Sequence, residues 1–266
     1  MAANARPVGI LGAMESEVRS LVQAMTVSAT GRGPGFEYWD GTFAGRRCVL
    51  ARCGMGKVSA AAGVQRLIDG WDVGCVIVCG LAGGLGPGLR LGDVVVGERF
   101  VQHDLDASPI FPRFQVPGLG IDVFPAHHAL VAAAEAAARA FVARLDREID
   151  AALLRPMGIS APRVHRGLIV SGDQFVKDDG ASAAILAALP DALCVEMEGG
   201  AVAQVCYLNR VPFVVVRVVS DRADAAAAAD FLTFVERVAP AYAAGIVREL
   251  LPRLPGSLGL YAESTG

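Results

Sequence analysis

The sequence predicts an α/β protein in which a central mixed, mostly parallel β-sheet lies between two helical layers, a three-layer αβα sandwich. Short runs rich in Val and Ile recur along the chain, and segments with helical spacing lie between them. The runs are apolar at every position rather than at alternate ones, which is typical of strands covered on both faces. Strands that alternate with helices pair mainly in parallel, because each helix returns the chain to the edge where the next strand begins.

Six apolar runs are predicted as buried strands, and most of them end in Gly, Ser or Asp, which favour turns. They are Val8–Leu11, Cys48–Arg52, Cys75–Cys79, Asp93–Val96, Leu168–Val170 and Phe213–Val219. Four segments with apolar residues at helical spacing are predicted as helices. They are Val58–Asp69, His127–Leu145, Glu198–Leu208 and Phe231–Leu251.

The chain has 266 residues, 53% of them hydrophobic, which is enough for one large domain with a sizeable core. No internal repeat divides it, so we expect residues 1–266 to form a single domain with a core from about 8 to 251. The segment Ser108–Phe124 is rich in Pro and Gly but also carries apolar residues, which predicts a pocket lid or an oligomer contact. We expect the tail 255–266 to be frayed.

Composition argues against several classes of function. The net charge of −3 provides no basic surface for nucleic acid. No apolar segment approaches the length of a membrane span, and the N-terminus lacks the apolar core of a signal peptide. The six cysteines include no C-x-x-C pair, and the histidines do not stand at zinc-ligand spacing from them. We therefore expect a soluble cytoplasmic protein with buried free thiols and with no metal, cofactor, nucleic-acid partner or membrane anchor.

Two glycine-rich segments each follow a predicted strand. Gly54–Ser59 opens a predicted helix, where backbone amides can meet an anion or a polar ligand. It matches a dinucleotide fingerprint only in part, because Ser59 replaces the third glycine and the next strand runs into Gly80 rather than an acidic residue. A tight turn without a ligand explains it equally well. Gly80–Leu85 would let backbone approach a ligand or a neighbouring strand closely.

Carboxylates at the ends of predicted strands are the most informative feature. Glu15 and Glu17 follow the first strand, Glu196 and Glu198 follow the run 193–195, and Asp221 follows the last strand. Taken singly, each is explained as a solvated or helix-capping acid, and Asp221 as an N-cap. As a set they predict a shared polar pocket, because ligands of open α/β sheets bind at the carboxyl ends of strands.

An arginine interrupts the last apolar strand. A buried guanidinium needs a partner, so we expect Arg217 to pair with one of these acids, for example Glu17. Several large apolar side chains near the acids could line a pocket, although core packing explains each of them singly. They are Met14, Met55, Phe175, Met197 and Phe231.

Together these motifs resemble the methylthioadenosine/S-adenosylhomocysteine nucleosidases of the purine nucleoside phosphorylase superfamily. Seven motifs match in the same order, and the resemblance covers about Val8 to Val247. They are Gly9–Glu17, Gly54–Val58, Gly80–Leu85, Leu91–Val96, Gly167–Asp173 with Phe175 after it, Val195–Glu198 and Pro212–Asp221. The resemblance implies a nucleoside phosphorylase-like fold, a homodimer, a small-molecule nucleoside substrate and a place in methionine salvage.

The resemblance also implies roles for matching residues. Asp221 matches the acid that protonates adenine N7, Glu17 matches the base that activates water, and Arg217 helps to hold the water and Glu17. The matching substrate-binding positions are Met14, Gly83, Phe175, Val176, Met197, Glu198, Ser220 and Phe231.

Within that set, the resemblance places each contact on a part of the nucleoside. Phe175 would stack on adenine while the Val176 backbone reads its edge. Glu198, with the Met197 backbone, would bind the ribose hydroxyls. Met14 and Phe231 would line the alkylthio pocket.

These residue types suit hydrolysis of an N-glycosidic bond. Protonation turns adenine from a poor leaving group into a neutral one, and the ribosyl group then gains positive charge. Carboxylates near the ribose stabilise that charge, as in glycosidases. The bond cut would be that of 5′-methylthioadenosine or S-adenosylhomocysteine, releasing adenine and the ribosyl thio product.

The sequence departs from the family pattern at two places. Leu81 stands where the family has a small hydroxyl residue, which bears on the position of the water and of Asp221. The Ser108–Phe124 segment is longer and more apolar than in short family members, which could reshape the thio side of the pocket.

Three alternatives remain at this stage. A phosphorylase would place an arginine where this chain has Gly92, although Arg90 and Lys57 are cations nearby in sequence. A nucleoside-binding protein without catalysis is compatible with Leu81. A related hydrolase could act on an adenine nucleoside with a bulkier 5′ substituent, such as a menaquinone precursor.

Overall fold

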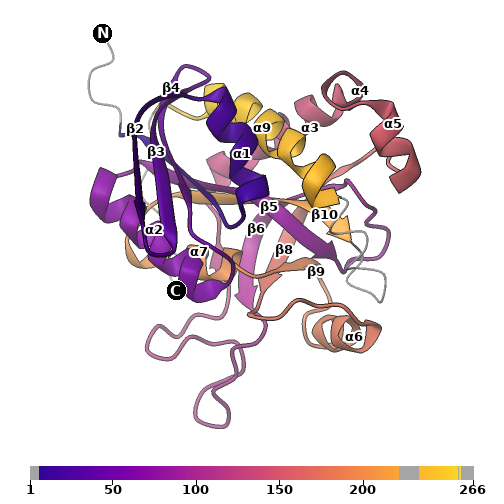
Figure 1. Cartoon of the computed structure of the whole chain (residues 1–266). Helices are drawn as coiled ribbons and strands as arrows, with labels where there is room; N and C mark the ends of the chain where they lie inside the picture. The colour runs from indigo at the N-terminus through magenta and orange to yellow at the C-terminus, as the bar shows by residue number, and fades with distance from the viewer. Residues whose placement is uncertain (1–5, 222–233, 257, 259–266) are drawn as a thin grey trace.

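The computed structural model describes residues 6–221, 234–256 and 258 (Figure 1). Its strands belong to one mixed sheet in the order β10-β6-β8-β9-β5-β1-β4-β3-β2, with β7 paired to β6. The strands are β1 (Val8–Gly12), β2 (Thr26–Gly33), β3 (Phe36–Phe43), β4 (Arg46–Arg52), β5 (Cys75–Gly84), β6 (Val94–Gln102), β7 (Phe124–Pro125), β8 (Val164–Ser171), β9 (Ala192–Glu196) and β10 (Phe213–Asp221). The α-helices are α1 (Glu15–Ala24), α2 (Lys57–Trp71), α3 (His128–Val142), α4 (Leu145–Glu148), α5 (Ala151–Leu154), α6 (Asp179–Ala188), α7 (Gly199–Leu208) and α9 (Ala239–Leu250).

The sheet brings together the carboxyl ends of strands that run in opposite directions. β1, β5 and β10 run in parallel, as do β6, β8 and β9. β5 and β9 are antiparallel, and their pairing involves only the ends of the strands, Gly83 with Val195 and Gly84 with Cys194. β10 also pairs with both β5 and β6. The five strands β5, β10, β6, β8 and β9 therefore close into a ring, and β1 lies outside it. The last residues of β5, β9 and β10 therefore meet at one place.

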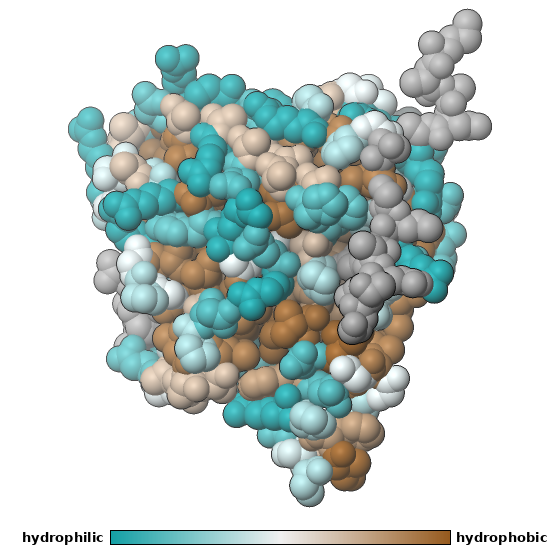
Figure 2. Space-filling model, turned by 180° about the vertical axis from the view of Figure 1, so that it is seen from behind, coloured by the Kyte–Doolittle hydropathy of each residue, from teal (hydrophilic) through white to brown (hydrophobic). Residues whose placement is uncertain are grey.

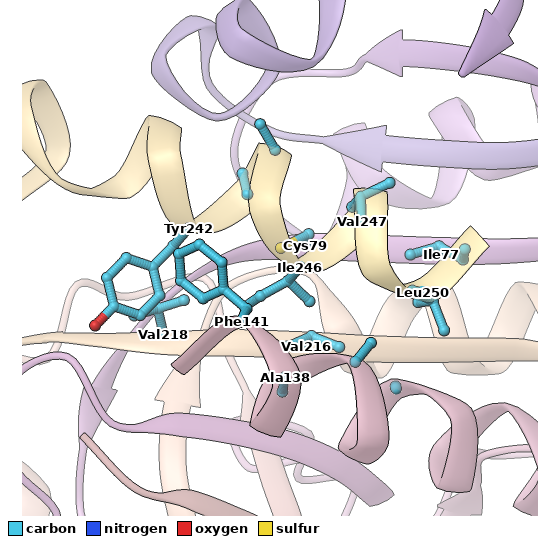
Figure 3. Packing of buried hydrophobic residues seen from close by; sticks show 14 of the residues in the cluster. Ile77, Cys79, Ala138, Phe141, Val216, Val218, Tyr242, Ile246, Val247 and Leu250 are labelled. Atoms are coloured by element: carbon cyan, nitrogen blue, oxygen red, sulfur yellow. The ribbon is translucent and has the colours of Figure 1, made fainter. Parts of the chain in front are cut away.

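Helices cover both faces of the sheet. On one face, α1, α3 and α9 contribute to the same apolar cluster as β1, β5 and β10, while α2 and α7 pack over the other face (Figure 1). In the first layer, Tyr242 and Ile246 of α9 lie beside Phe141 of α3 and above Val216 and Val218 of β10 (Figure 3). The predicted mixed sheet between helical layers is thus confirmed.

Small residues allow these helices to approach closely. A Cβ atom at Gly245 of α9 would overlap the ring of Phe141 in α3. Phe141 also makes an edge-on contact with Tyr242, with ring centroids 5.0 Å apart. Packing at this density makes a core sensitive to changes in side-chain volume.

The six predicted strands are present, and the structure adds elements that the sequence did not indicate. The main addition is the β2–β3 hairpin, which continues into β4. β2 is largely exposed and polar, so it carries no apolar run from which to predict it. The helices α1 and α6 were also not predicted. Of the helix expected from Phe231 to Leu251, the described part is α9, and Phe231 itself lies outside the described residues.

The segment between β6 and β7 protrudes from the body of the molecule (Figure 1). Residues 105–122, here called the protruding loop, contain Ile110, whose exposed fraction is 82%, and the partly exposed Phe111. The space-filling view shows apolar atoms at the tip of this protrusion (Figure 2). This is the segment expected to be a lid or an oligomer contact, and that role stays a prediction.

Two other expectations concern burial and membranes. All six cysteines are buried and free, as predicted. Among the residues that the structure describes, no helix is long and apolar enough to cross a bilayer.

Removing the Phe141 ring should destabilise the fold. Phe141 is fully buried between α3, α9 and β10, so Phe141→Ala should lower the free energy of unfolding by about 3–5 kcal/mol. Urea unfolding followed by circular dichroism measures this loss. As a control, Val58→Ala on α2, where the exposed fraction is 81%, should change the free energy by no more than about 0.5 kcal/mol. A similar effect of both substitutions would contradict the packing described here.

Candidate active site

A pocket opens where the ends of β1, β5, β9 and β10 meet, and it holds about 550 Å³ of space not filled by protein. Most of the residues that the sequence assigned to a site line it. The lining residues are Ala13, Met14, Glu17, Met55, Leu81, Ala82, Gly83, Gln174, Phe175, Val176, Val195, Glu196, Met197, Glu198 and Asp221. Strands far apart in the sequence thus bring the predicted acids together.

Glu17 lies in the first turn of α1, and three backbone amides hold its carboxylate. Its Oε2 accepts hydrogen bonds from the amides of Ala13 (2.8 Å) and Met14 (3.0 Å), and its Oε1 accepts one from Leu81 (3.3 Å). The carboxylate therefore caps α1 and at the same time faces the pocket. The sequence left open whether Glu17 caps a helix or faces a pocket, and its carboxylate does both.

The Gly54–Gly56 turn supplies an amide to a carboxylate of the pocket. The Gly56 amide donates to Oε1 of Glu198 at 2.9 Å, and the next amide, of Lys57, donates to Asp173 at 2.8 Å. Gly54 and Gly56 have φ angles of 84° and 94°, which side-chain-bearing residues rarely adopt. The turn thus binds an anionic group, as its position at a helix start suggested, but that group belongs to the protein itself.

Arg217 pairs with two of the acids at the strand ends, as expected, although Glu17, the example given, is not one of the two. Its Nη2 donates to Glu196 through a short contact and lies 3.1 Å from Oε2 of Glu198. Glu17 is instead held by amides just before α1 and by one amide of β5. The example of Glu17 as the partner is therefore replaced by Glu196, the last residue of β9, and Glu198, two residues after it.

Glu196 was named among the strand-end acids but was given no role of its own, and the structure shows that it anchors the start of α7. Both amides at the start of α7, Glu198 (3.1 Å) and Gly199 (2.8 Å), donate to its Oε2. The hydroxyl of Ser171, at the end of β8, also donates to it and accepts from the Gly200 amide at 2.6 Å. The signal was present in the Glu-x-Glu spacing at the end of β9, which places both acids in the pocket lining and lets the first of them also accept the amides at the start of α7.

Burial and neighbouring charges shift the pKa values of Glu198 and Arg217 in opposite directions. Burial raises the pKa of Glu198 to about 7, and this happens although Arg217 acts to lower it. Burial by itself would lower the pKa of Arg217, but the Glu196 and Glu198 carboxylates outweigh it and raise that pKa. Glu198 therefore changes charge near neutral pH, while Arg217 stays cationic.

Asp221 is the last residue of β10 and is buried at the pocket wall. The Ser220 hydroxyl lies 2.9 Å from its Oδ2 and 3.4 Å from the carbonyl oxygen of Ala82. Asp221 pairs across the sheet with Gly83, so both reach the pocket at the same level. The residues after Asp221 lie outside the described part of the chain, and its predicted N-cap role is not tested.

Comparison with known proteins identifies the family. A family model described as the phosphorylase superfamily matches residues 7–252. A 5′-methylthioadenosine/S-adenosylhomocysteine nucleosidase of Aeromonas salmonicida is 34% identical over 247 residues, 93% of this chain and 99% of the relative. One from Exiguobacterium is 35% identical over 235 residues, 86% of this chain and 91% of the relative. The chain belongs to this nucleosidase family.

Solved structures of the family agree in fold. A nucleosidase of Neisseria meningitidis in complex with methylthio-immucillin-A is 37% identical and superposes with a TM-score of 0.83 over 94% of this chain and 100% of that one. A nucleosidase of Colwellia psychrerythraea in complex with adenine is 32% identical, with a TM-score of 0.84 over 97% and 99% of the two chains. The predicted fold class is therefore confirmed.

The nucleosidase pocket also has an apolar wall. The lining residues Met14, Met55, Phe175 and Met197 are brought together as predicted, with Val176 beside them. Phe231 was predicted to belong to this wall and lies outside the described residues. Leu81, which departs from the family pattern, is buried in the lining, and its backbone amide still holds Glu17.

The cations that could have bound phosphate are engaged elsewhere. Lys57 pairs with Asp104 at 2.6 Å, and Arg90 donates to the carbonyl oxygen of Ala161 at 3.1 Å. Gly92 has a φ of 83°, and a Cβ atom there would lie 2.9 Å from Ile159, so a larger side chain would be strained and would displace its neighbours. Neither Lys57 nor Arg90 lines the pocket as described. No group of three potential metal ligands occurs in the described parts of the chain either.

Gly80 should tolerate no side chain. A Cβ atom there would lie 2.6 Å from Oε1 of Glu17 and would overlap the Arg217 guanidinium. Gly80→Ala should therefore lower the free energy of unfolding by about 1–3 kcal/mol. Gly70→Ala, in the last turn of α2 with open space around it, is the matched control and should stabilise by up to about 1 kcal/mol. Chemical denaturation of both variants tests this, and a stable Gly80→Ala protein would contradict the described geometry.

Proposed function

We propose that the protein hydrolyses the N-glycosidic bond of 5′-methylthioadenosine and S-adenosylhomocysteine, releasing adenine and the ribosyl thio product. The observation that carries this proposal is the convergence of Glu17, Glu198 and Asp221 on one pocket with an apolar wall. Relatives over nearly the whole chain carry this activity in their names, and solved neighbours hold adenine or methylthio-immucillin-A. The reaction therefore matches both the residue types and the family.

In this proposal each acid acts on a different part of the substrate. Asp221 donates a proton to adenine N7, so that adenine leaves as a neutral base. Glu17 accepts a proton from the water that attacks the anomeric carbon, and its three amide donors fix its orientation. Glu198 accepts hydrogen bonds from the ribose hydroxyls, and its charge favours the cationic ribosyl group.

The remaining residues position the substrate. Phe175 stacks on adenine, the Val176 backbone reads its edge, and Met14 contacts the 5′ thio group. Met197 and Gly83 complete the pocket wall around the ribose and the base. Ser220 orients Asp221 through its hydroxyl, which lies 2.9 Å from the carboxylate.

Arg217 serves as a positioning residue. It touches Glu196 and Glu198, and Glu196 in turn receives the first amides of α7. A positive charge at this point lets two buried acids stand close together. Arg217 thereby fixes the carboxylate that meets the ribose.

Hydrolysis is favoured over phosphorolysis by the charges in the pocket. The buried carboxylates Glu17, Glu196 and Glu198 surround the place where the nucleophile would bind, and they would repel a phosphate dianion. Lys57 pairs with Asp104, Arg90 donates to the Ala161 carbonyl oxygen, and a side chain at Gly92, where a phosphorylase has arginine, would be strained. Water, which is neutral, meets no such barrier.

Catalysis is favoured over binding alone because the substitution at Leu81 leaves the base in place. The backbone amide of Leu81 still donates to Glu17.

We further propose that the protein is a cytoplasmic homodimer that serves methionine salvage. The exposed apolar side chains of the protruding loop, Ile110 and Phe111, support contact with a second copy.

Turnover should occur without phosphate and should depend on both proposed catalytic acids. In phosphate-free buffer the protein should release adenine and a free ribosyl sugar, detected by chromatography. Glu17→Gln and Asp221→Asn should each lower kcat by about 10²- to 10⁴-fold, because each removes one proton transfer. Asp146→Asn, at an exposed position on α4, is the control and should leave kcat unchanged. A strict need for phosphate, with ribosyl phosphate as product, would refute hydrolysis, and no turnover by the unmodified protein would favour a binding protein.

Substrate binding should weaken on the acid side of neutrality. Glu198 has a pKa raised to about 7, so below that pH it holds a proton and can no longer accept from both ribose hydroxyls. KM for methylthioadenosine should therefore rise as the pH falls through about 7 and level off above it. The Glu198→Gln variant should bind weakly at every pH and should lack this transition. If the transition persisted in that variant, another group would have to cause it.

A further inference from the structure

A second cavity adjoins the substrate pocket at its thio end. This cavity, here called the outer groove, holds about 900 Å³ of space, part of it open to solvent. Ala13, Met14 and Met55 line both cavities, so the two are continuous at the side chain proposed to contact the 5′ thio group. A substituent longer than a methyl group would extend from the pocket into this groove.

The groove is formed by the start of α1, the β2–β3 hairpin and the end of β4, which lie on one side of the molecule (Figure 1). Its lining carries four charged side chains, in contrast to the apolar wall of the pocket next to it. They are Glu15, Arg32, Glu37 and Arg52. The environment of a 5′ substituent therefore changes from apolar to ionic just beyond Met14.

The charged side chains are arranged as two guanidinium groups around one carboxylate. Glu37 is almost buried, with 11% of its side chain exposed, and pairs with Arg52 at 2.5 Å and with Arg32 by a shorter contact. Arg52 stands opposite Gly12 of β1 on one side and Glu37 of β3 on the other, so the sheet fixes its backbone. An arginine carries five N–H donors, and one shared carboxylate leaves both guanidinium groups with donors to spare.

The fourth charged residue has the opposite sign and is loosely held. Glu15 lies 3.6 Å from Arg52 and 3.6 Å from Arg19, and 67% of its side chain is exposed. Exposed pairs at this distance contribute little energy, so Glu15 can turn to another cation at small cost. The groove thus offers guanidinium donors for an anion and a carboxylate for a cation.

We propose that the outer groove binds the α-amino-acid end of S-adenosylhomocysteine, with the substrate carboxylate between Arg32 and Arg52 and the ammonium group near Glu15. Methylthioadenosine has only a methyl group at the sulfur, whereas the homocysteine substituent ends in one carboxylate and one ammonium group. Planar pairing with a carboxylate is the geometry for which arginine is best suited. This inference rests on the proposed function, since it concerns which 5′ substituents the same pocket accepts.

Substrate preference measures the contribution of the groove. Arg52→Met should lower kcat/KM for S-adenosylhomocysteine by about 10- to 100-fold, the effect of losing a hydrogen bond between charged groups, and should leave kcat/KM for methylthioadenosine within about twofold. Arg32→Met should act in the same direction, and added salt should weaken only the turnover of S-adenosylhomocysteine. Decarboxylated S-adenosylhomocysteine, which keeps the ammonium group, should be insensitive to Arg52→Met.

Controls separate this inference from the function on which it rests. Arg47→Met removes another arginine of β4, paired with Asp40 at 3.1 Å outside the groove, and should change neither substrate. If Arg52→Met lost methylthioadenosine turnover through misfolding, Arg32→Met would decide, because 78% of the Arg32 side chain is exposed. An unchanged ratio of the two kcat/KM values in Arg32→Met would overturn the groove assignment. If the unmodified protein cleaved neither substrate, the proposed function itself would fail.

Discussion

The ion pairs of Arg217 are the interaction on which the rest of the site depends. A guanidinium inside a buried strand neutralises two carboxylates, Glu196 and Glu198, that would otherwise repel each other in a region of low dielectric. Removing one partner of such a buried pair leaves an unpaired charge, which commonly costs about 3–5 kcal/mol. The same cation joins β10 to the start of α7. Arg217 therefore both balances the charge of the pocket and holds two of its walls together.

The balance of charge around the pocket also selects the chemistry. The buried carboxylates of Glu17, Glu196 and Glu198 favour a positively charged ribosyl group and disfavour an anionic nucleophile. Two glycines contribute to this arrangement: Gly80 leaves room for Glu17 and Arg217 beside the same strand, and the conformation of Gly92 disfavours an arginine. Hydrolysis of a nucleoside thus depends on the positions that lack a side chain as well as on the residues that touch the substrate.

Much of this arrangement can be predicted from the sequence, for identifiable reasons. The buried strands are apolar throughout, and the acids stand where those strands end, so both the sheet and the convergence of Glu17, Glu198 and Asp221 are visible in the pattern. The β2–β3 hairpin was not predicted: β2 is exposed and follows no apolar period, and β3 mixes buried aromatic residues with polar ones rather than forming a continuous apolar run. The partner of Arg217 could not be chosen from sequence either, since the choice between Glu17 and Glu196 depends on how the ends of β5 and β9 cross. The outer groove depends on that hairpin and was missed with it.

The closed ring of β5, β10, β6, β8 and β9 has a consequence for how this enzyme family can diversify. Each strand of the ring is hydrogen-bonded on both sides, so the pocket floor can neither widen nor shift register without breaking several ladders at once. Variation in what the pocket accepts must then arise in the segments outside the ring, such as the β2–β3 hairpin and the protruding loop. The ring therefore fixes the positions of Glu196, Arg217 and Asp221, while the segments outside it can change independently.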